Sequence, residues 1–293
     1  MVSGATGFIG SAFIRRALAA GHEVLALVRA PERAAATLPA HPALTVLVGT
    51  LDEPPWSPIV RFGAETCLLA AWITRPAGYR ASPENRRLLA QSVALASGLL
   101  ERGVGRLVAL GTCEEYAPAA ERVEETRSPL DPVSAYARAK HELRLALEAR
   151  AGEAGAGLTW ARIFQPYGVG EHPTRLPSLV IRRLRAGERV TLQTPGTLHD
   201  WINVEDIAAA LLCLVRAGAD GVFNVGTGSG HTVEHVALGI ARLLGRAELV
   251  ASDAAADDPP AWLVADTARL RRLGWAPRVD LEAGLAALIE RIR

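Results

Sequence analysis

The sequence predicts an α/β protein: a doubly wound parallel sheet of the Rossmann type with a smaller, mixed cap. Short apolar runs of strand length alternate with amphipathic stretches of helical periodicity, which is the βαβα order of a parallel sheet. A glycine-rich turn opens the chain, and the regular alternation stops after Ile163. The 293 residues suffice for one large domain with a smaller lobe.

Five apolar runs are predicted as buried strands, and the segments between them as helices. The strands are 22–29, 44–48, 66–71, 106–111 and 158–163, and the helices are 11–20, 85–102 and 135–150. Only Met1 and Val2 precede Ser3, so either the first strand is very short or residues are missing upstream.

The later chain is predicted to leave the sheet and return to it. A helix over 176–186 follows the irregular segment, and a helix over 204–217 with a strand over 221–225 returns to the sheet. We therefore expect a Rossmann domain of residues 1–164 and 200–227 and a substrate-binding cap of residues 165–199 and 228–293. The Pro-rich, acidic segment Asp253–Pro260 is expected to be a surface loop.

Composition excludes several classes of function. A net charge of +1, with 32 Lys+Arg against 31 Asp+Glu, gives no overall field that would attract nucleic acid or an anionic membrane. The widely spaced Cys67, Cys113 and Cys213 suggest neither disulfides nor a metal site. No apolar stretch has the length of a membrane span, and no signal peptide is recognisable, so we expect a cytoplasmic protein.

The turn Ser3–Gly10 (SGATGFIG) predicts a dinucleotide site. Its glycines allow a tight turn and close approach of a pyrophosphate, which the N-terminus of the following helix would bind. The second predicted strand ends at Arg29, with Arg33 shortly after it, where an acidic residue would bind the ribose hydroxyls of NAD(H). An arginine attracts a 2′-phosphate, which favours NADP(H) over NAD(H).

A Tyr and a Lys share one face of the predicted helix 135–150. Tyr136 and Lys140 are four residues apart, and an ammonium beside a phenol favours the phenolate, so the pair can carry the proton that accompanies hydride transfer. Thr112 follows the predicted strand 106–111, where its hydroxyl would face the ligand crevice. These three residues are the predicted catalytic centre.

The motifs GATGFIG, GTCEEY, YARAK, RIFQPYG, DWINVEDIA and FNVGTG together resemble the extended short-chain dehydrogenase/reductases, the NAD(P)-dependent sugar epimerase/dehydratase family. The resemblance extends over nearly the whole chain. It implies an oxidoreductase or epimerase with a Thr112, Tyr136 and Lys140 centre, and a cap that binds a nucleotide-linked sugar. The sequence leaves a homodimer open.

The resemblance also implies the cofactor contacts. Glycines 4, 7 and 10 would bind the pyrophosphate, Ala71 would line the cleft and Phe164 would lie near the nicotinamide. The candidate cofactor-binding residues are Gly4, Thr6, Gly7, Phe8, Ile9, Gly10, Arg29, Arg33, Leu51, Ala71, Tyr136, Lys140 and Phe164.

Several positions depart from the family pattern. His199 stands where an arginine usually grips the diphosphate, and Gln165 where an asparagine is usual. His199 is either a surface residue or a phosphate donor, while Arg175 is the expected replacement clamp, its alternative being a solvent-facing cation. Glu114 matches the base of sugar 4,6-dehydratases or is a solvated loop residue. The candidate substrate-binding residues are Glu114, Gln165, Arg175 and His199.

The expected function is NADP(H)-dependent reduction of a keto group on a nucleotide-activated (deoxy)sugar. The alternatives are a nucleotide-sugar epimerase that uses the same centre, a 4,6-dehydratase that uses Glu114, and a non-catalytic NADP(H)-sensing protein on the same fold.

Overall fold

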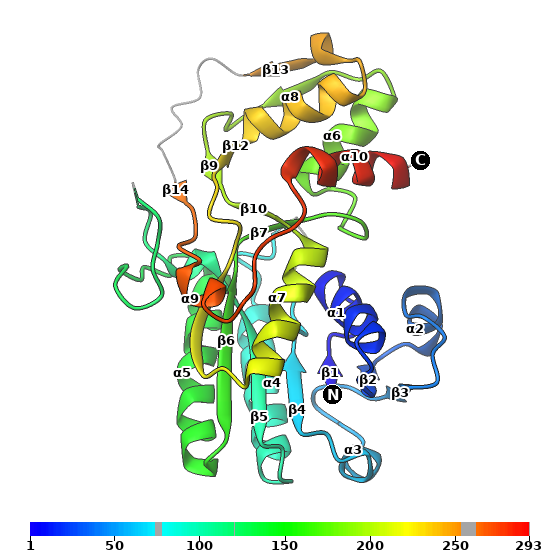
Figure 1. The fold of residues 1–293 in the computed structure, drawn as a ribbon, viewed down its shortest axis with the longest axis vertical. Helices are drawn as coiled ribbons and strands as arrows, with labels where there is room; N and C mark the ends of the chain where they lie inside the picture. The colour runs from blue at the N-terminus through cyan, green and yellow to red at the C-terminus, as the bar shows by residue number, and fades with distance from the viewer. Residues whose placement is uncertain (74–77, 120, 253–261, 293) are drawn as a thin grey trace.

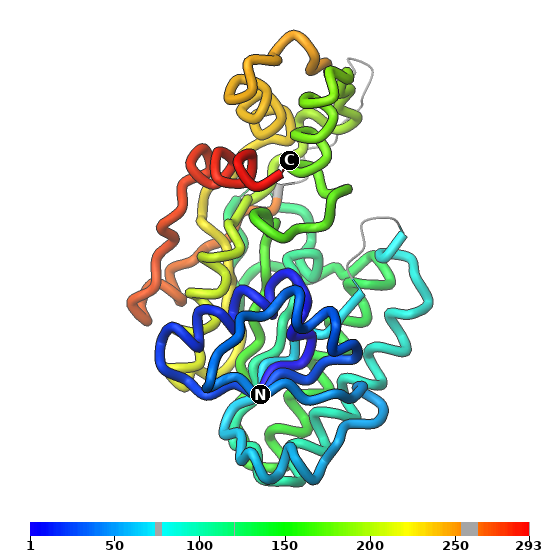
Figure 2. The backbone as a smooth tube through the Cα atoms, turned by 90° about the vertical axis from the view of Figure 1, so that its right-hand side faces the viewer, coloured from blue at the N-terminus to red at the C-terminus, as the bar shows by residue number. Residues whose placement is uncertain are grey.

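The computed structural model describes residues 1–73, 78–119, 121–252 and 262–292. A large sheet covered by helices forms the lower part of the molecule in Figure 1. Above it lies a smaller lobe that contains α6 (Leu176–Arg185), α8 (Val233–Leu243) and α10 (Leu281–Arg291). The N-terminus lies in the sheet domain and the C-terminus in the smaller lobe (Figure 2). The expected surface loop Asp253–Pro260 falls outside the described residues.

The large sheet has seven parallel strands in the order β11-β6-β5-β4-β1-β2-β3. The chain proceeds from β1 outward to β3, then crosses back to β4 and continues to β11, so the direction of winding changes between β1 and β4. Ligands of open parallel sheets bind at such a switch point, outside the carboxyl ends of the strands. The strands are β1 (Val2–Ser3), β2 (Val24–Val28), β3 (Leu44–Val48), β4 (Thr66–Leu69), β5 (Arg106–Thr112), β6 (Gly157–Ile163) and β11 (Gly221–Val225).

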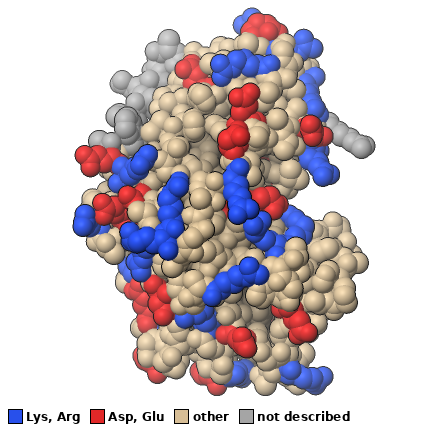
Figure 3. All heavy atoms as spheres, viewed as in Figure 1, with Lys and Arg blue, Asp and Glu red and all other residues tan. Residues whose placement is uncertain are grey.

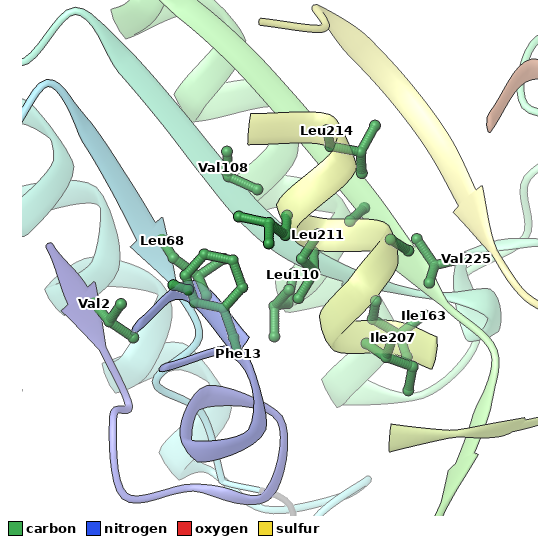
Figure 4. Packing of buried hydrophobic residues seen from close by; sticks show 14 of the residues in the cluster. Val2, Phe13, Leu68, Val108, Leu110, Ile163, Ile207, Leu211, Leu214 and Val225 are labelled. Carbon is green, nitrogen blue, oxygen red and sulfur yellow. The ribbon is translucent and has the colours of Figure 1, made fainter. Parts of the chain in front are cut away.

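Helices cover both faces of this sheet, which confirms the doubly wound fold. On one face α1 (Phe8–Ala19) packs beside α7 (Val204–Ala217), and on the other α4 (Glu84–Leu100) packs beside α5 (Ala135–Ala154). Figure 4 shows Phe13, Leu211 and Leu214 over the sheet residues Leu68 and Val108. Each such buried side chain contributes about 1.5–3 kcal/mol of hydrophobic stabilisation.

The boundaries differ from the prediction at several ends. The first long helix begins at Phe8 rather than at residue 11, because Gly7 takes the N-cap position directly after the turn. The helix carrying Tyr136 continues to Ala154, where Gly155 ends it in the left-handed conformation. Two short helices, α2 (Pro31–Thr37) and α3 (Trp56–Phe62), were not predicted, since seven residues are too few to show a clear period.

The smaller lobe has its own apolar core, formed largely by α6, α8 and α10. The strands β7 (Gln165–Tyr167) and β10 (Trp201–Asn203) pair between this lobe and the sheet domain, while β8 (Val190–Leu192) and β13 (Val250–Ser252) pair within the lobe. The central strand β9 (Leu198–His199) pairs with β12 (His231–Thr232) and β14 (Trp262–Leu263). Between the lobe's last two helices, Ala265, Leu270 and Trp275 return to the core of the sheet domain.

Side chains of both charge signs are interspersed over the face seen in Figure 3. Within the described residues no helix is long and apolar enough to cross a bilayer. The same residues contain no cluster of three or more His, Cys, Asp or Glu side chains arranged to hold a metal ion.

Candidate active site

The glycine turn joins β1 to α1 in the conformation that a dinucleotide requires. Gly4 has a φ of 68°, and a Cβ there would lie 2.6 Å from the backbone of Ala70 and Ala71 after β4. A Cβ at Gly10 would lie 2.3 Å from the carbonyl oxygen of Gly4. Side chains at either position would therefore force the turn open.

This cradle fits a pyrophosphate. The helix that follows has no side-chain cap and no acidic residue in its first turn. The backbone N–H groups of Phe8, Ile9 and Gly10 could therefore bind an anion, which the positive end of the helix dipole would also favour. The turn also brings Gly4 against Ala71. The family resemblance implies that both residues line the cofactor site, although they are 67 residues apart in the sequence.

The remaining cofactor candidates lie at the ends of neighbouring strands. Arg29 is exposed directly after β2, and Arg33 is exposed on α2. Leu51 is half-buried after β3. The side chain of Phe164, which follows β6, is only 1% exposed and packs against Tyr116, so its ring belongs to the core.

Thr112, Tyr136 and Lys140 meet at the carboxyl end of β5. Thr112 ends this strand, and Tyr136 and Lys140 extend from the first two turns of α5, whose N-cap Ser134 accepts the N–H of Ala137. The hydroxyl of Thr112, which accepts the backbone N–H of Glu114 at 3.2 Å, lies close enough to the phenol of Tyr136 to act on its pKa. The ammonium of Lys140 donates to the carbonyl oxygen of Leu110 at 2.9 Å. All three predicted catalytic residues are buried and adjacent.

Burial sets the protonation of this centre. It raises the pKa of Tyr136 well above its usual value, and the nearby Tyr79 and Glu114 add to this increase. It lowers the pKa of Lys140 to about 7, although the charge of Glu115 acts in the opposite direction. The expectation that the Lys140 ammonium favours the phenolate stays a prediction, since the rise in the pKa of Tyr136 comes first from burial.

Trp72 closes one side of the centre. Its ring lies 3.9 Å from Nζ of Lys140 and stands edge-on to Tyr136, with 6.5 Å between the ring centroids. Its indole N–H donates to Asn85 at 2.9 Å, and Asn85 in turn donates to the carbonyl oxygen of Tyr79. The ring is thus fixed over the lysine.

A second group, the outer cluster of Tyr79, Arg80 and Glu114, borders the phenol. The guanidinium of Arg80 donates to both carboxylate oxygens of Glu114 at 3.0–3.1 Å, and the phenol of Tyr79 donates to one of them at 3.1 Å. The ring of Tyr79 stands edge-on to Tyr136 at 5.0 Å. The backbone N–H of Tyr136 donates to the carbonyl oxygen of Arg80, which ties this loop to α5.

The candidate substrate residues of the smaller lobe are dispersed. Arg175 is the half-buried N-cap residue of α6; burial raises the pKa of Tyr79 to about 12, and the charge of Arg175 partly offsets this rise, which indicates that Arg175 lies on the side of the outer cluster. Gln165 is half-buried on β7. His199 lies in the central strand β9, edge-on to Trp201 at 5.7 Å.

Sequence reasoning missed two features of the site. Tyr79 and Arg80 have no local pattern that assigns them a partner, because Glu114 lies 34 and more residues away. The other feature was visible: Lys140 is the only lysine in the 293 residues, a chain that otherwise uses arginine for its permanent cations. Of these two side chains, only lysine can lose its proton near neutral pH when it is buried.

Residues 1–226 match the family described as the NAD dependent epimerase/dehydratase family. The chain belongs to this family. The dTDP-6-deoxy-L-talose 4-dehydrogenase (NAD(P)(+)) of Kitasatospora kifunensis is 30% identical over 307 residues, covering 98% of this chain and 93% of that protein. The dTDP-glucose 4,6-dehydratase of Streptomyces griseus is 28% identical, covering 99% of this chain and 92% of its own length.

A solved structure agrees with this assignment. The structure described as MoeE5 in complex with UDP-glucose and NAD is 28% identical, with a TM-score of 0.83 over 99% of this chain and 97% of that one. The curated relatives are matched over 36% to 93% of their own lengths. This chain is accordingly an NAD(P)-dependent enzyme of the extended short-chain dehydrogenase/reductase type.

Proposed function

We propose that this enzyme is an NADP(H)-dependent reductase that acts on a keto group of a nucleotide-activated (deoxy)sugar. The observation that carries the proposal is the phenol of Tyr136, which is buried beside Thr112 and Lys140 and which keeps its proton at neutral pH because burial raises its pKa. A carbonyl oxygen that gains negative charge during reduction needs such a proton donor. When bound, the nicotinamide supplies the hydride.

Each residue of the centre has a distinct role in this proposal. The Thr112 hydroxyl holds the carbonyl oxygen, and Tyr136 donates the proton to it. The ammonium of Lys140 lies one helical turn from Tyr136 and holds the sugar of the cofactor. The half-exposed Trp72 and Tyr79 border the space above Tyr136.

NADP(H) rather than NAD(H) is proposed from the end of β2. Arg29 is exposed there, and a guanidinium favours a 2′-phosphate that a carboxylate would repel. We expect calorimetric titration to give tighter binding of NADPH than of NADH, and Arg29→Ala to remove most of the difference while Arg61→Ala, an exposed arginine on α3, leaves it intact. Equal affinities in the parent protein would contradict the assignment.

The division of the chain belongs to the same proposal. Residues 1–164 and 200–227 would bind the cofactor, and 165–199 with most of 228–293 the nucleotide sugar, with Arg175 as the clamp for its diphosphate. The homodimer and the cytoplasmic location remain predictions. The relatives' names support a nucleotide sugar, since they act on dTDP-linked substrates.

The alternatives are distinguished by what they do to the cofactor. A reductase consumes one NADPH for each ketone, whereas an epimerase and a dehydratase return the cofactor unchanged. We expect the purified enzyme to reduce NADP⁺ when given dTDP-6-deoxy-L-talose, the substrate in the name of the Kitasatospora relative, as seen in the nicotinamide absorbance. If the enzyme interconverts UDP-sugars without net change of the cofactor, it is an epimerase and the reductase proposal is wrong. If it removes water from dTDP-glucose without such a change, it is a dehydratase. Tight NADPH binding without any turnover would indicate the sensing function.

A further inference from the structure

A buried ion pair lies directly behind Thr112. Glu115, the last residue of η1 (Cys113–Glu115), is 0% exposed, and its carboxylate binds Nε of Arg162 at 3.0 Å. The indole N–H of Trp160 donates to the same carboxylate at 3.0 Å. We call Glu115, Trp160 and Arg162 the inner cluster.

The inner cluster holds the backbone of the catalytic strand. Oε1 of Glu115 accepts the backbone N–H of Thr112 at 3.0 Å, which closes a capping box in which Thr112 is the N-cap. Two residues earlier on β5, the carbonyl oxygen of Leu110 accepts the ammonium of Lys140. Between them, a Cβ at Gly111 would lie 2.7 Å from Oε1 of Glu115, so only glycine allows this approach.

Glu115 and Lys140 therefore bind the backbone of β5 at two positions that are two residues apart, Thr112 and Leu110. Among the described residues, Glu115 on η1 is the charged group that acts on Lys140, and Arg162 on β6 binds Glu115. Tyr136 is the titratable group on the same helix, one turn away, and Tyr79 packs against the ring of Tyr136. Only Glu115 contributes a negative charge that favours the ammonium. In a buried site such a charge acts strongly because little water screens it.

We propose that Glu115 is the positioning residue of the catalytic centre: its carboxylate fixes the backbone of Thr112 and supplies the negative charge that favours the protonated form of Lys140. The role of Glu115 in the lysine's charge stands independently of the proposed function, and only its effect on turnover rests on that function. Arg162 keeps the carboxylate ionised and in place, since an unpaired buried carboxylate would be costly.

The lone lysine makes this proposal directly measurable. Lysine labelled with ¹³C at Cε gives a single lysine resonance in this protein, and its titration reports the protonation of Lys140 alone. We expect Glu115→Gln to lower the titration midpoint by about one pH unit or more, and kcat to fall about tenfold. Glu114→Gln, the neighbouring carboxylate on the outer side, should leave the Lys140 midpoint at the parent value.

A second variant tests the proposal if Glu115→Gln does not fold. The pair Glu115→Leu with Arg162→Met removes both charges, and apolar replacement of a whole buried ion pair is often tolerated. It should lower the Lys140 midpoint as well. An unchanged midpoint in either folded variant, or a midpoint that falls while kcat stays at the parent value, would overturn the proposal. A lowered midpoint in a protein that turns over no keto sugar would instead overturn the proposed function.

Discussion

Glu114 and Glu115 are neighbours in sequence, yet the structure assigns them to opposite sides of η1. Glu114 turns toward the cleft, where Tyr79 and the largely exposed Arg80 bind it. Glu115 turns inward, where Arg162 and Trp160 bind it with no exposed surface on either charged side chain. Both carboxylates pair with an arginine at 3.0 Å, so distance does not distinguish them.

What distinguishes the two pairs is solvation. Water and salt screen the outer pair, and exposed ion pairs contribute roughly 0–1 kcal/mol, so this contact orients a loop more than it stabilises the fold. The inner pair has lost its water, and removal of one partner of such a pair costs about 3–5 kcal/mol. In the proposed function the inner cluster therefore supports the catalytic centre from the buried side, and the outer cluster lies on its more exposed side.

The largest effect on turnover is expected at the phenol of Tyr136, in the catalytic centre between the two clusters. Tyr136→Phe removes the proton donor but keeps the ring that packs against Tyr79 and Trp72. We expect turnover to fall by about 10²–10⁴-fold, the usual contribution of a general acid, with NADPH affinity preserved. Steady-state kinetics on an accepted ketone together with calorimetric titration of NADPH measures both. Full activity in this variant would place the proton source elsewhere, with Tyr79 the next candidate.

Much of this centre could be predicted from sequence, because its parts have local signatures. The glycine turn, the four-residue spacing of Tyr136 and Lys140, and the position of Thr112 after a strand all follow from short-range patterns. The run Thr112-Cys113-Glu114-Glu115 also contains the Thr-x-x-Glu signature of a capping box, which would have singled out Glu115.

The partners of the two glutamates could not be predicted in the same way. Arg162 follows Glu115 by 47 residues, and Arg80 precedes Glu114 by 34. Both contacts arise only when β5 pairs with β6 and when the loop before α4 folds against α5. The degree of burial was equally hidden: the spacing of Tyr136 and Lys140 shows that they are close together but not that burial raises the pKa of the phenol.

A smaller effect is expected at Arg175, on the border of the cleft. If its guanidinium holds the diphosphate of the substrate, Arg175→Ala should raise the KM for a nucleotide sugar by about tenfold, equivalent to about 1.4 kcal/mol, without changing NADPH affinity. Arg183→Ala is the matched control, since that residue of α6 is paired with Glu188 at 4.0 Å. If the KM for the nucleotide sugar rises in Arg183→Ala and not in Arg175→Ala, then Arg183 rather than Arg175 binds the diphosphate.

The smallest effect is expected at Glu114, and it decides between two chemistries. A dehydratase base must be free to accept a proton from the substrate, but the Glu114 carboxylate already accepts hydrogen bonds from Arg80 and Tyr79. In a reductase Glu114 only orients the outer cluster. A glutamine at this position keeps an oxygen that can accept the hydrogen bond of Tyr79. Glu114→Gln should therefore lower kcat by about threefold or less. That limit corresponds to about 0.7 kcal/mol of transition-state stabilisation, which is within the range of an exposed ion pair. The measurement is kcat for keto-sugar reduction in parent and variant at one pH, with the reaction of dTDP-glucose followed in parallel. A loss of about a hundredfold or more with dTDP-glucose would identify Glu114 as a catalytic base and the enzyme as a dehydratase.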